Sequence, residues 1–250
     1  MTGDFYTPLR TRASEIAASQ GTPSFYRIFK RELQESLQRL QENVVLKQCI
    51  SHIDIVQEGM GHGYEHSKAV AVDAGALVMI EAEKMDISGD IIEKLIITAH
   101  ISGLLHDIKR GNENHAIAGS EEARRILVCS GIDSRFKRYI AVAIRNHEAF
   151  KTVVPPEDEY ERLISNVLYD ADKFRWGQEN FTKTVWDMLE FGNISPEVFL
   201  ENYRKGIEYI ERIKETFRTE TGKRYGPEII DMGLEIGKVI YSELKRTLGR

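Results

Sequence analysis

Hydrophobic positions recur at steps of three and four residues along most of the chain, which is the spacing of amphipathic helices. One long helix is predicted to begin after Thr22 and Pro23 and to carry an apolar face through Phe25, Ile28, Phe29, Leu33, Leu37 and Leu40. Further helices are predicted from about His66 to Glu83, around Ile164 to Leu168, and from about Pro227 to Leu248. Hardly any stretch alternates as a half-buried strand does, so the predicted fold class is all-α.

Several predicted helices carry recognisable start residues. Asp90 with Glu93 three residues later is typical of a reciprocal cap, and Ser120 can cap the segment that Gly131 would close. Asp133 can open the next helix, and Ser195 followed by Pro196 indicates another start.

Four of the apolar faces end in a histidine or an aspartate. The faces lead from Ile92 through Gly103 to His106, from Phe136 through Ile144 to His147, from Ile164 through Leu168 to Asp172, and backwards from Leu77 through Val70 to His66. Asp107 follows His106 directly. We therefore expect these side chains to point toward the core.

Buried carboxylates near imidazoles suggest a bound cation. An ionised carboxylate is costly to bury unless it is paired or binds a cation, and imidazoles with carboxylates suit divalent metals. Cys49 and Cys129 are the only cysteines and form no paired motif, so a thiolate zinc site is not expected. The alternative is a set of hydrogen-bonded core histidines.

The ordered set closely resembles the HD superfamily of metal-dependent phosphohydrolases. The resemblance rests on "GHGYEHSKAV" with His66, "LLHDIKR" with His106 and Asp107, and "YDADKF" with Asp172. His62 also matches a histidine often found at its place in the family. The resemblance covers residues 51–176 and implies a metal-binding helical bundle there. Residues 1–50 and 177–250 are then helical extensions of one domain spanning 1–250.

By this resemblance His66, His106, Asp107 and Asp172 are the primary metal ligands. Asp170 is the alternative to Asp172 as the fourth ligand, but Asp172 continues the apolar face of its helix and is therefore favoured. His115 and His147 resemble ligands of a second ion, and His115 alternatively contacts substrate. The resemblance therefore implies one or two divalent ions per chain, with Mn, Fe, Co, Ni, Zn and Mg as the candidates.

The implied activity is hydrolysis of a phosphoester, and the implied substrate is a nucleotide or a related small phosphorylated metabolite. The resemblance does not distinguish a phosphomonoester from a phosphodiester. Asp107 could also act as the base for the attacking water, with Glu113 or Glu148 as acid. Lys109 and Arg110 are the first candidates for phosphate contacts, while Arg145, Lys173 and Arg175 flank other ligands. Trp176 either stacks on the substrate or packs in the core.

Two other functions fit the same residues. Some relatives use a histidine-rich two-iron site for oxygen chemistry, which makes a di-iron oxygenase an alternative. The other is a non-catalytic, ligand-sensing module with a structural metal.

Composition narrows the partners. A net charge of -5 over 250 residues argues against a nucleic-acid surface. No apolar run approaches the roughly 18 residues of a membrane span, and the first residues lack the apolar segment of a signal peptide, so we expect a cytoplasmic protein without membrane contact. The terminal helices could cover the site or form a dimer interface, so a homo-oligomer is one possible oligomeric state.

Overall fold

The structure is a computed structural model that describes residues 3–52 and 63–249. Within these ranges every regular element is a helix, so the predicted all-α fold is confirmed. None of these helices is both long and apolar enough to cross a membrane. The elements are α1 (Gly3–Gln20), α2 (Ser24–Ile28), α3 (Lys30–Glu42), α4 (Val44–Ile50), α5 (Tyr64–Lys84), α6 (Asp90–Leu105), α7 (His115–Ile126), α8 (Ser134–Arg145), α9 (Glu159–Phe174), the π-helix η2 (Asn180–Thr184), α10 (Val185–Phe191), α11 (Pro196–Ile213) and α12 (Glu220–Thr247).

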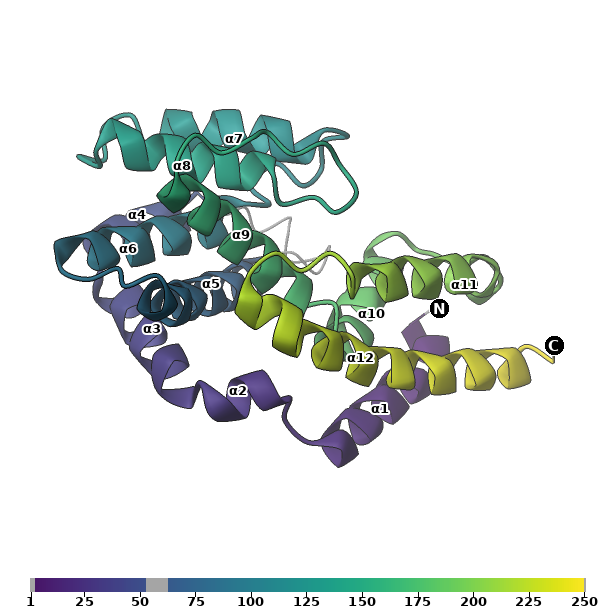
Figure 1. The fold of residues 1–250 in the computed structure, drawn as a ribbon. Coiled ribbons are helices and arrows are strands. Elements are labelled where there is room, and N and C mark those ends of the chain that lie inside the picture. The colour runs from purple at the N-terminus through teal and green to yellow at the C-terminus, as the bar shows by residue number, and fades with distance from the viewer. Residues whose placement is uncertain (1–2, 53–62, 250) are drawn as a thin grey trace.

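Helices α5, α6, α8 and α9 pack against one another around the main core (Figure 1). The backbones of α5 and α6 approach closely at Gly103, where an added Cβ would lie 2.5 Å from Ala71 Cα and 2.6 Å from Ala71 N. Only a residue without a side chain fits at this crossing. The contact fixes the end of α6, where His106 follows, beside the first turns of α5, where His66 lies.

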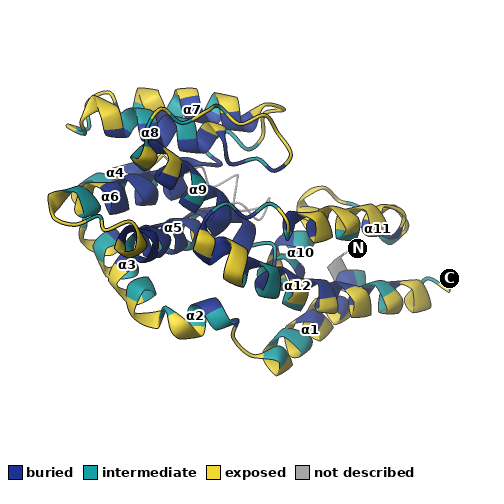
Figure 2. Ribbon diagram, viewed as in Figure 1, coloured by how far each residue is buried: buried dark blue, intermediate teal, exposed yellow. Residues whose placement is uncertain are grey.

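The remaining helices complete two sides of the molecule. Helices α3 and α4 pack on α5 and α6, and α7 packs on α8. Helices α1, α10, α11 and α12 gather at the other end together with η2, and both termini lie there (Figure 1). Figure 2 shows α9 buried between these groups while α7, α11 and α12 expose their outer faces. The division at residues 51 and 176 stays a prediction.

The long helix predicted after Thr22 is broken at Phe29, which has φ -99° and ψ 31°. The short α2 that precedes the break buries Phe25, whose ring centroid lies 4.8 Å from that of Phe174. Ile28, expected on the apolar face, is exposed. Thr22 is not the cap either, because Pro23 holds the N-cap position without a side-chain hydrogen bond.

Two further cap predictions are wrong. Gly89, with φ 71°, precedes α6, so Asp90 is its first residue and not its cap. Helix α7 begins at His115, six residues before the start that a Ser120 cap predicts, and the Ser120 hydroxyl donates to the Ala141 carbonyl 2.7 Å away on α8. A hydroxyl inside a helix can bond a neighbouring helix as well as its own backbone, and sequence alone does not distinguish these uses.

The caps predicted at Asp133 and Ser195 are present. The Asp133 carboxylate accepts from Arg135 N at 2.8 Å, and the Ser195 hydroxyl accepts from Val198 N. Asp158, which sequence reasoning did not single out, caps α9 by accepting from Glu161 N at 2.9 Å.

His100 is a buried core residue with a defined protonation state. The Ser36 hydroxyl donates to the Val72 carbonyl at 2.7 Å, so it must accept from His100 Nε2, 2.9 Å away. A second proton would have to reside on Nδ1, which is buried without a hydrogen-bond partner. Burial lowers the pKa of His100 to about 3, and the imidazole is therefore neutral.

Candidate metal centre

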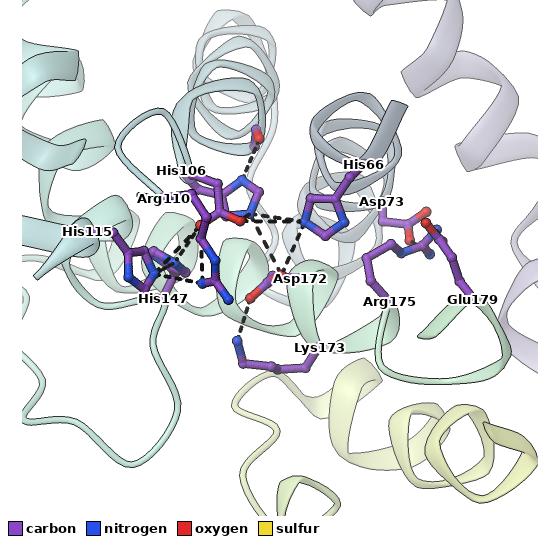
Figure 3. A network of polar contacts seen from close by, with 12 residues as sticks. His66, Asp73, His106, Arg110, His115, His147, Asp172, Lys173, Arg175 and Glu179 are labelled. Atoms are coloured by element: carbon purple, nitrogen blue, oxygen red, sulfur yellow. Dashed lines mark hydrogen bonds and ion pairs between the residues drawn. The ribbon is translucent and has the colours of Figure 1, made fainter. Parts of the chain in front are cut away.

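The ends of four helices bring the candidate ligands together, as Figure 3 shows. His66 lies in the first turn of α5, and His106 is the C-cap residue of α6. His147 follows the end of α8, and Asp172 lies in the last turn of α9. All four side chains are buried. His62 lies outside the described residues.

The Asp107 carboxylate lies between two pairs of imidazoles. Its Oδ2 is 3.3 Å from His106 Nε2 and 4.0 Å from His66 Nε2. Its Oδ1 is 3.5 Å from His147 Nε2 and 3.7 Å from His115 Nε2. Each oxygen therefore completes a group of three donor atoms that lie within 4.8 Å of one another.

Asp172 adds a second carboxylate to the first group. Its Oδ1 is 3.7 Å from His66 Nε2 and 3.8 Å from His106 Nε2. Asp170, its competitor in the sequence, points elsewhere and accepts from Arg218 N, Thr219 N and Thr219 Oγ1 at 2.7–2.8 Å. Asp170 thus fastens the segment that precedes α12, and Asp172 is the aspartate at the centre.

Hydrogen bonds on the outer side of the rings fix which nitrogen faces the centre. His106 Nδ1 donates to the Gly103 carbonyl at 2.8 Å, and His147 Nδ1 donates to the Ile144 carbonyl at 2.6 Å. When these imidazoles are neutral, their Nε2 atoms carry lone pairs. His115 Nε2 accepts from Arg110 Nη1 at 3.0 Å, so this nitrogen also carries a lone pair and not a proton.

The donor set fits a divalent cation. The Nε2 atoms of His115 and His147 are 3.3 Å apart, and both are acceptors by the bonds just described, so they repel unless a cation lies between them. His66 Nε2 and His106 Nε2 show the same 3.3 Å separation. Two imidazole nitrogens this close would be able to share one divalent ion as ligands. The two groups could therefore hold divalent metals.

The electrostatics of the cluster favour positive charge. Burial alone lowers the pKa of His106, but Asp107 and Asp172 raise it, and the net shift is upward. Burial raises the pKa of Asp172, but Lys173 and the surrounding histidines outweigh it, so the carboxylate is ionised. Burial and the neighbouring His147 lower the pKa of His115 to about 4. A neutral imidazole and an ionised carboxylate are the forms that ligate metals.

The structure brings two of the five predicted cations to the centre. Arg110 Nη1 lies 3.7 Å from Asp107 Oδ1, and the buried Lys173 ammonium bonds Asp172. Lys109 turns away, with Nζ 3.6 Å from Glu122 Oε2 of α7. Arg145 is exposed and does not line the cavity at the centre.

A cavity of about 400 Å³ opens onto these residues. Arg110 and Lys173 line it beside the ligands, and so do Glu113 and Glu148. Glu148 is half-buried, with Oε1 3.9 Å from His115 Nδ1, whereas Glu113 is exposed. The cavity is therefore polar and ringed by ligands, cations and acids.

Trp176 is half-buried in the wall of this cavity, which is the pocket-lining position considered for it. Its neighbour there is Tyr209 of α11, with ring centroids 5.5 Å apart. Sequence reasoning missed Tyr209, because a tyrosine on an amphipathic helix outside the motifs carries no distinguishing pattern.

A buried ion-pair network next to the centre was also missed. Arg175, the C-cap residue of α9 and a predicted phosphate contact, instead bonds Asp73 of α5, and its Nη1 donates to Glu179 at 2.9 Å. The Tyr26 hydroxyl donates to Asp73 at 2.8 Å. Asp73 lies two helical turns after His66, and Arg175 lies one turn after Asp172, so their spacing could have indicated a link between the two ligand-bearing helices.

No protein-family model matches the chain. Two curated relatives from Bradyrhizobium sp. strains BTAi1 and ORS 278 are both named bifunctional uridylyltransferase/uridylyl-removing enzyme. They are 29% and 28% identical to this chain over 138 residues, which cover 50% of the chain but only 15% of each relative. The chain is also similar to a crystal structure of a "predicted HD superfamily hydrolase" from an uncultured Thermotogales bacterium. The two chains are 22% identical, the TM-score is 0.45, and the match covers 79% of this chain and 92% of the other. The chain resembles the HD superfamily.

Proposed function

We propose that the chain is a metal-dependent phosphohydrolase whose centre holds two divalent cations with Asp107 between them. The observation that carries this proposal is the placement of the two Asp107 oxygens, one toward His66 and His106 and the other toward His115 and His147. Bound divalent cations lower the pKa of water toward neutrality and neutralise charge on phosphoryl oxygens.

The side chains around the centre fit a phosphoryl group. Arg110 presents a guanidinium fork next to Asp107, and Lys173 presents an ammonium in the same cavity. Both donate to phosphoryl oxygens and hold the group against the centre. Glu148 is better placed than Glu113 to protonate a leaving oxygen, because it is half-buried beside His115.

Asp107 then serves as a shared ligand and not as the base. Both of its oxygens face imidazole nitrogens, and a carboxylate that holds two cations has little basicity left for a proton. The proposed substrate is a small phosphorylated molecule, with a nucleotide as the leading candidate. The names of the Bradyrhizobium relatives support a phosphoester substrate, because removing a uridylyl group breaks a phosphoester bond.

The test combines metal content with turnover. We would purify the protein without chelator, count metals per chain by elemental mass spectrometry, and assay a phosphoester panel with added manganese. We expect about two equivalents in the parent, about one in His147→Ala and almost none in Asp107→Ala, with hydrolysis reduced at least about a hundredfold in both variants. His52→Ala removes an exposed histidine and serves as the matched control.

The outcomes separate the three functions. A parent protein without metal and without manganese-dependent turnover would overturn the proposal. Bound iron with an oxygen-dependent absorbance change, and no hydrolysis, would support the di-iron oxygenase. Bound metal that raises the melting temperature without turnover of any ester would support the sensing module.

A further inference from the structure

A second cavity, of about 300 Å³, adjoins the metal centre. It lies between the end of α9, the η2–α10 segment and α11, and His66 and Arg110 line its inner end. Arg110, Trp176 and Tyr209 line this cavity and the polar cavity alike. A molecule held at the centre can therefore extend past these three side chains into the second cavity.

The second cavity is apolar. Its wall consists mostly of aromatic and aliphatic side chains, among them Phe181, Phe199, Tyr203, Ile207 and Ile210. Such a wall favours groups that gain from leaving water.

Among the described lining residues, unpaired charge is confined to the Arg110 end of this cavity. Arg175 is the other cation in its wall, but Asp73 and Glu179 pair with its guanidinium. Among the described lining residues, Arg110 is thus the cation placed to meet a phosphate. A phosphoryl group is held at the Arg110 end, and the rest of the molecule faces an uncharged wall.

The side chains at the junction are suited to a flat ring. The Trp176 and Tyr209 rings lie 5.5 Å apart with their planes inclined by 41°. Tyr209 is 37% exposed, so part of its ring is open to a ligand. Aromatic groups gain from stacked or edge-to-face contacts with such rings in addition to the area they bury.

We propose that this apolar cavity binds an aromatic ring system of the substrate while the metal centre holds its phosphoester. This inference rests on the proposed phosphohydrolase function and names the class of substrate. A nucleobase and a synthetic aryl group share the chemistry, and separate substrates distinguish them.

Gly206 offers a clean way to block the cavity. It lines the cavity on the exposed side of α11, and an added Cβ at this position meets no atom within 4 Å. The Cβ of Gly206→Phe has open space, and its ring is added at a residue that lines the cavity. Replacing a helical glycine favours the helix, so the melting temperature should not fall. Glu201→Phe adds the same ring on the same helix at an exposed residue outside the cavity, and it is the matched control.

We would compare kcat/KM for 1-naphthyl phosphate and adenosine 5′-phosphate with that for glycerol 2-phosphate, which has no ring. The parent and Glu201→Phe should prefer at least one ring-bearing ester by about tenfold or more, and Gly206→Phe should lose most of that preference. The preferred ester identifies an aryl group or a nucleobase. Equal kcat/KM for all three esters in the parent, or an unchanged preference in Gly206→Phe, would overturn the inference.

A binding measurement keeps the inference separate from the proposed function. If no ester is hydrolysed, the phosphohydrolase proposal fails, but the cavity can still be tested by calorimetric titration of the protein with 1-naphthyl phosphate. We expect Gly206→Phe to weaken binding by about tenfold relative to Glu201→Phe. Equal dissociation constants in the two variants would show that the ring does not enter the cavity.

Discussion

Replacing Gly103 by alanine tests whether the close crossing of α5 and α6 sets the metal centre. The added Cβ would lie 2.5 Å from Ala71 Cα and 2.6 Å from Ala71 N. Carbon atoms in ordinary contact are about 3.5–4.0 Å apart, so the helices must separate locally by roughly 1 Å. Both contacts are to backbone atoms, and a change of rotamer cannot relieve them.

The separation acts directly on the ligands. The Gly103 carbonyl accepts from His106 Nδ1 at 2.8 Å, and His106 Nε2 lies 3.3 Å from His66 Nε2 on the other helix. Metal sites tolerate errors of about 0.2 Å in ligand distance, so a shift near 1 Å should weaken manganese binding by about ten- to a hundredfold. Overpacking should lower the free energy of unfolding by about 1–3 kcal/mol, or about 2–4 °C of melting temperature per kcal/mol.

Calorimetric titration with manganese and thermal unfolding of the metal-free protein measure the two effects. Gly111→Ala is the matched control, because an added Cβ there meets no atom within 4 Å. The reasoning is refuted if Gly103→Ala binds manganese and unfolds as the control does. Lower stability with unchanged manganese affinity would refute only the link between the crossing and the ligand pair.

Two further predictions concern residues around the centre. Burial holds the pKa of His100 at about 3, below its unfolded value near 6.5, so the stability that the neutral imidazole contributes is complete above pH 6.5 and is lost as the pH falls toward 3. In His100→Gln, whose amide can still donate to Ser36, the unfolding free energy from denaturant titrations should depend less steeply on pH below 6.5, by up to about 1.4 kcal/mol per pH unit. Equal slopes in the parent and the variant would contradict this prediction. Asp170→Asn should lower the melting temperature, because it weakens the buried hydrogen bonds from Thr219, but the variant should still bind metal. Asp172→Asn should lose its metal in elemental analysis. The opposite pattern of metal content would show that Asp170, and not Asp172, is the ligand.

Helical periodicity was sufficient to find the ends of the ligand-bearing faces. His106, His147 and Asp172 each continue an apolar stripe, and a stripe that must face the core constrains the direction of its last side chain. The same argument could have excluded Arg145, which lies two residues before His147 and therefore on the far side of the turn. The structure places Arg145 in solvent.

Periodicity gave no information about the turn that follows α6. Arg110 N donates to the Asp107 carbonyl at 2.8 Å, and this turn directs Arg110 toward the centre while Lys109 faces Glu122. Which of two adjacent cations turns inward depends on the path of the turn and on the position of α7. The start of α7 at His115 has no capping side chain to mark it, so the sequence does not indicate that His115 begins a helix.

Helix α9 shows why the wall of the apolar cavity cannot be predicted from the sequence. Within seven residues, the end of α9 and the turn after it direct Asp170 to the segment before α12, Asp172 to the candidate metal centre, Arg175 to Asp73 on α5, and Trp176 to the junction of the two cavities. The order of these faces follows from the helical repeat. What each face meets follows from where α5, α11 and α12 pack, which depends on the whole core. The metal centre can therefore be predicted from residues at helix ends, whereas the apolar cavity becomes visible only when α11 is placed against α9 and η2.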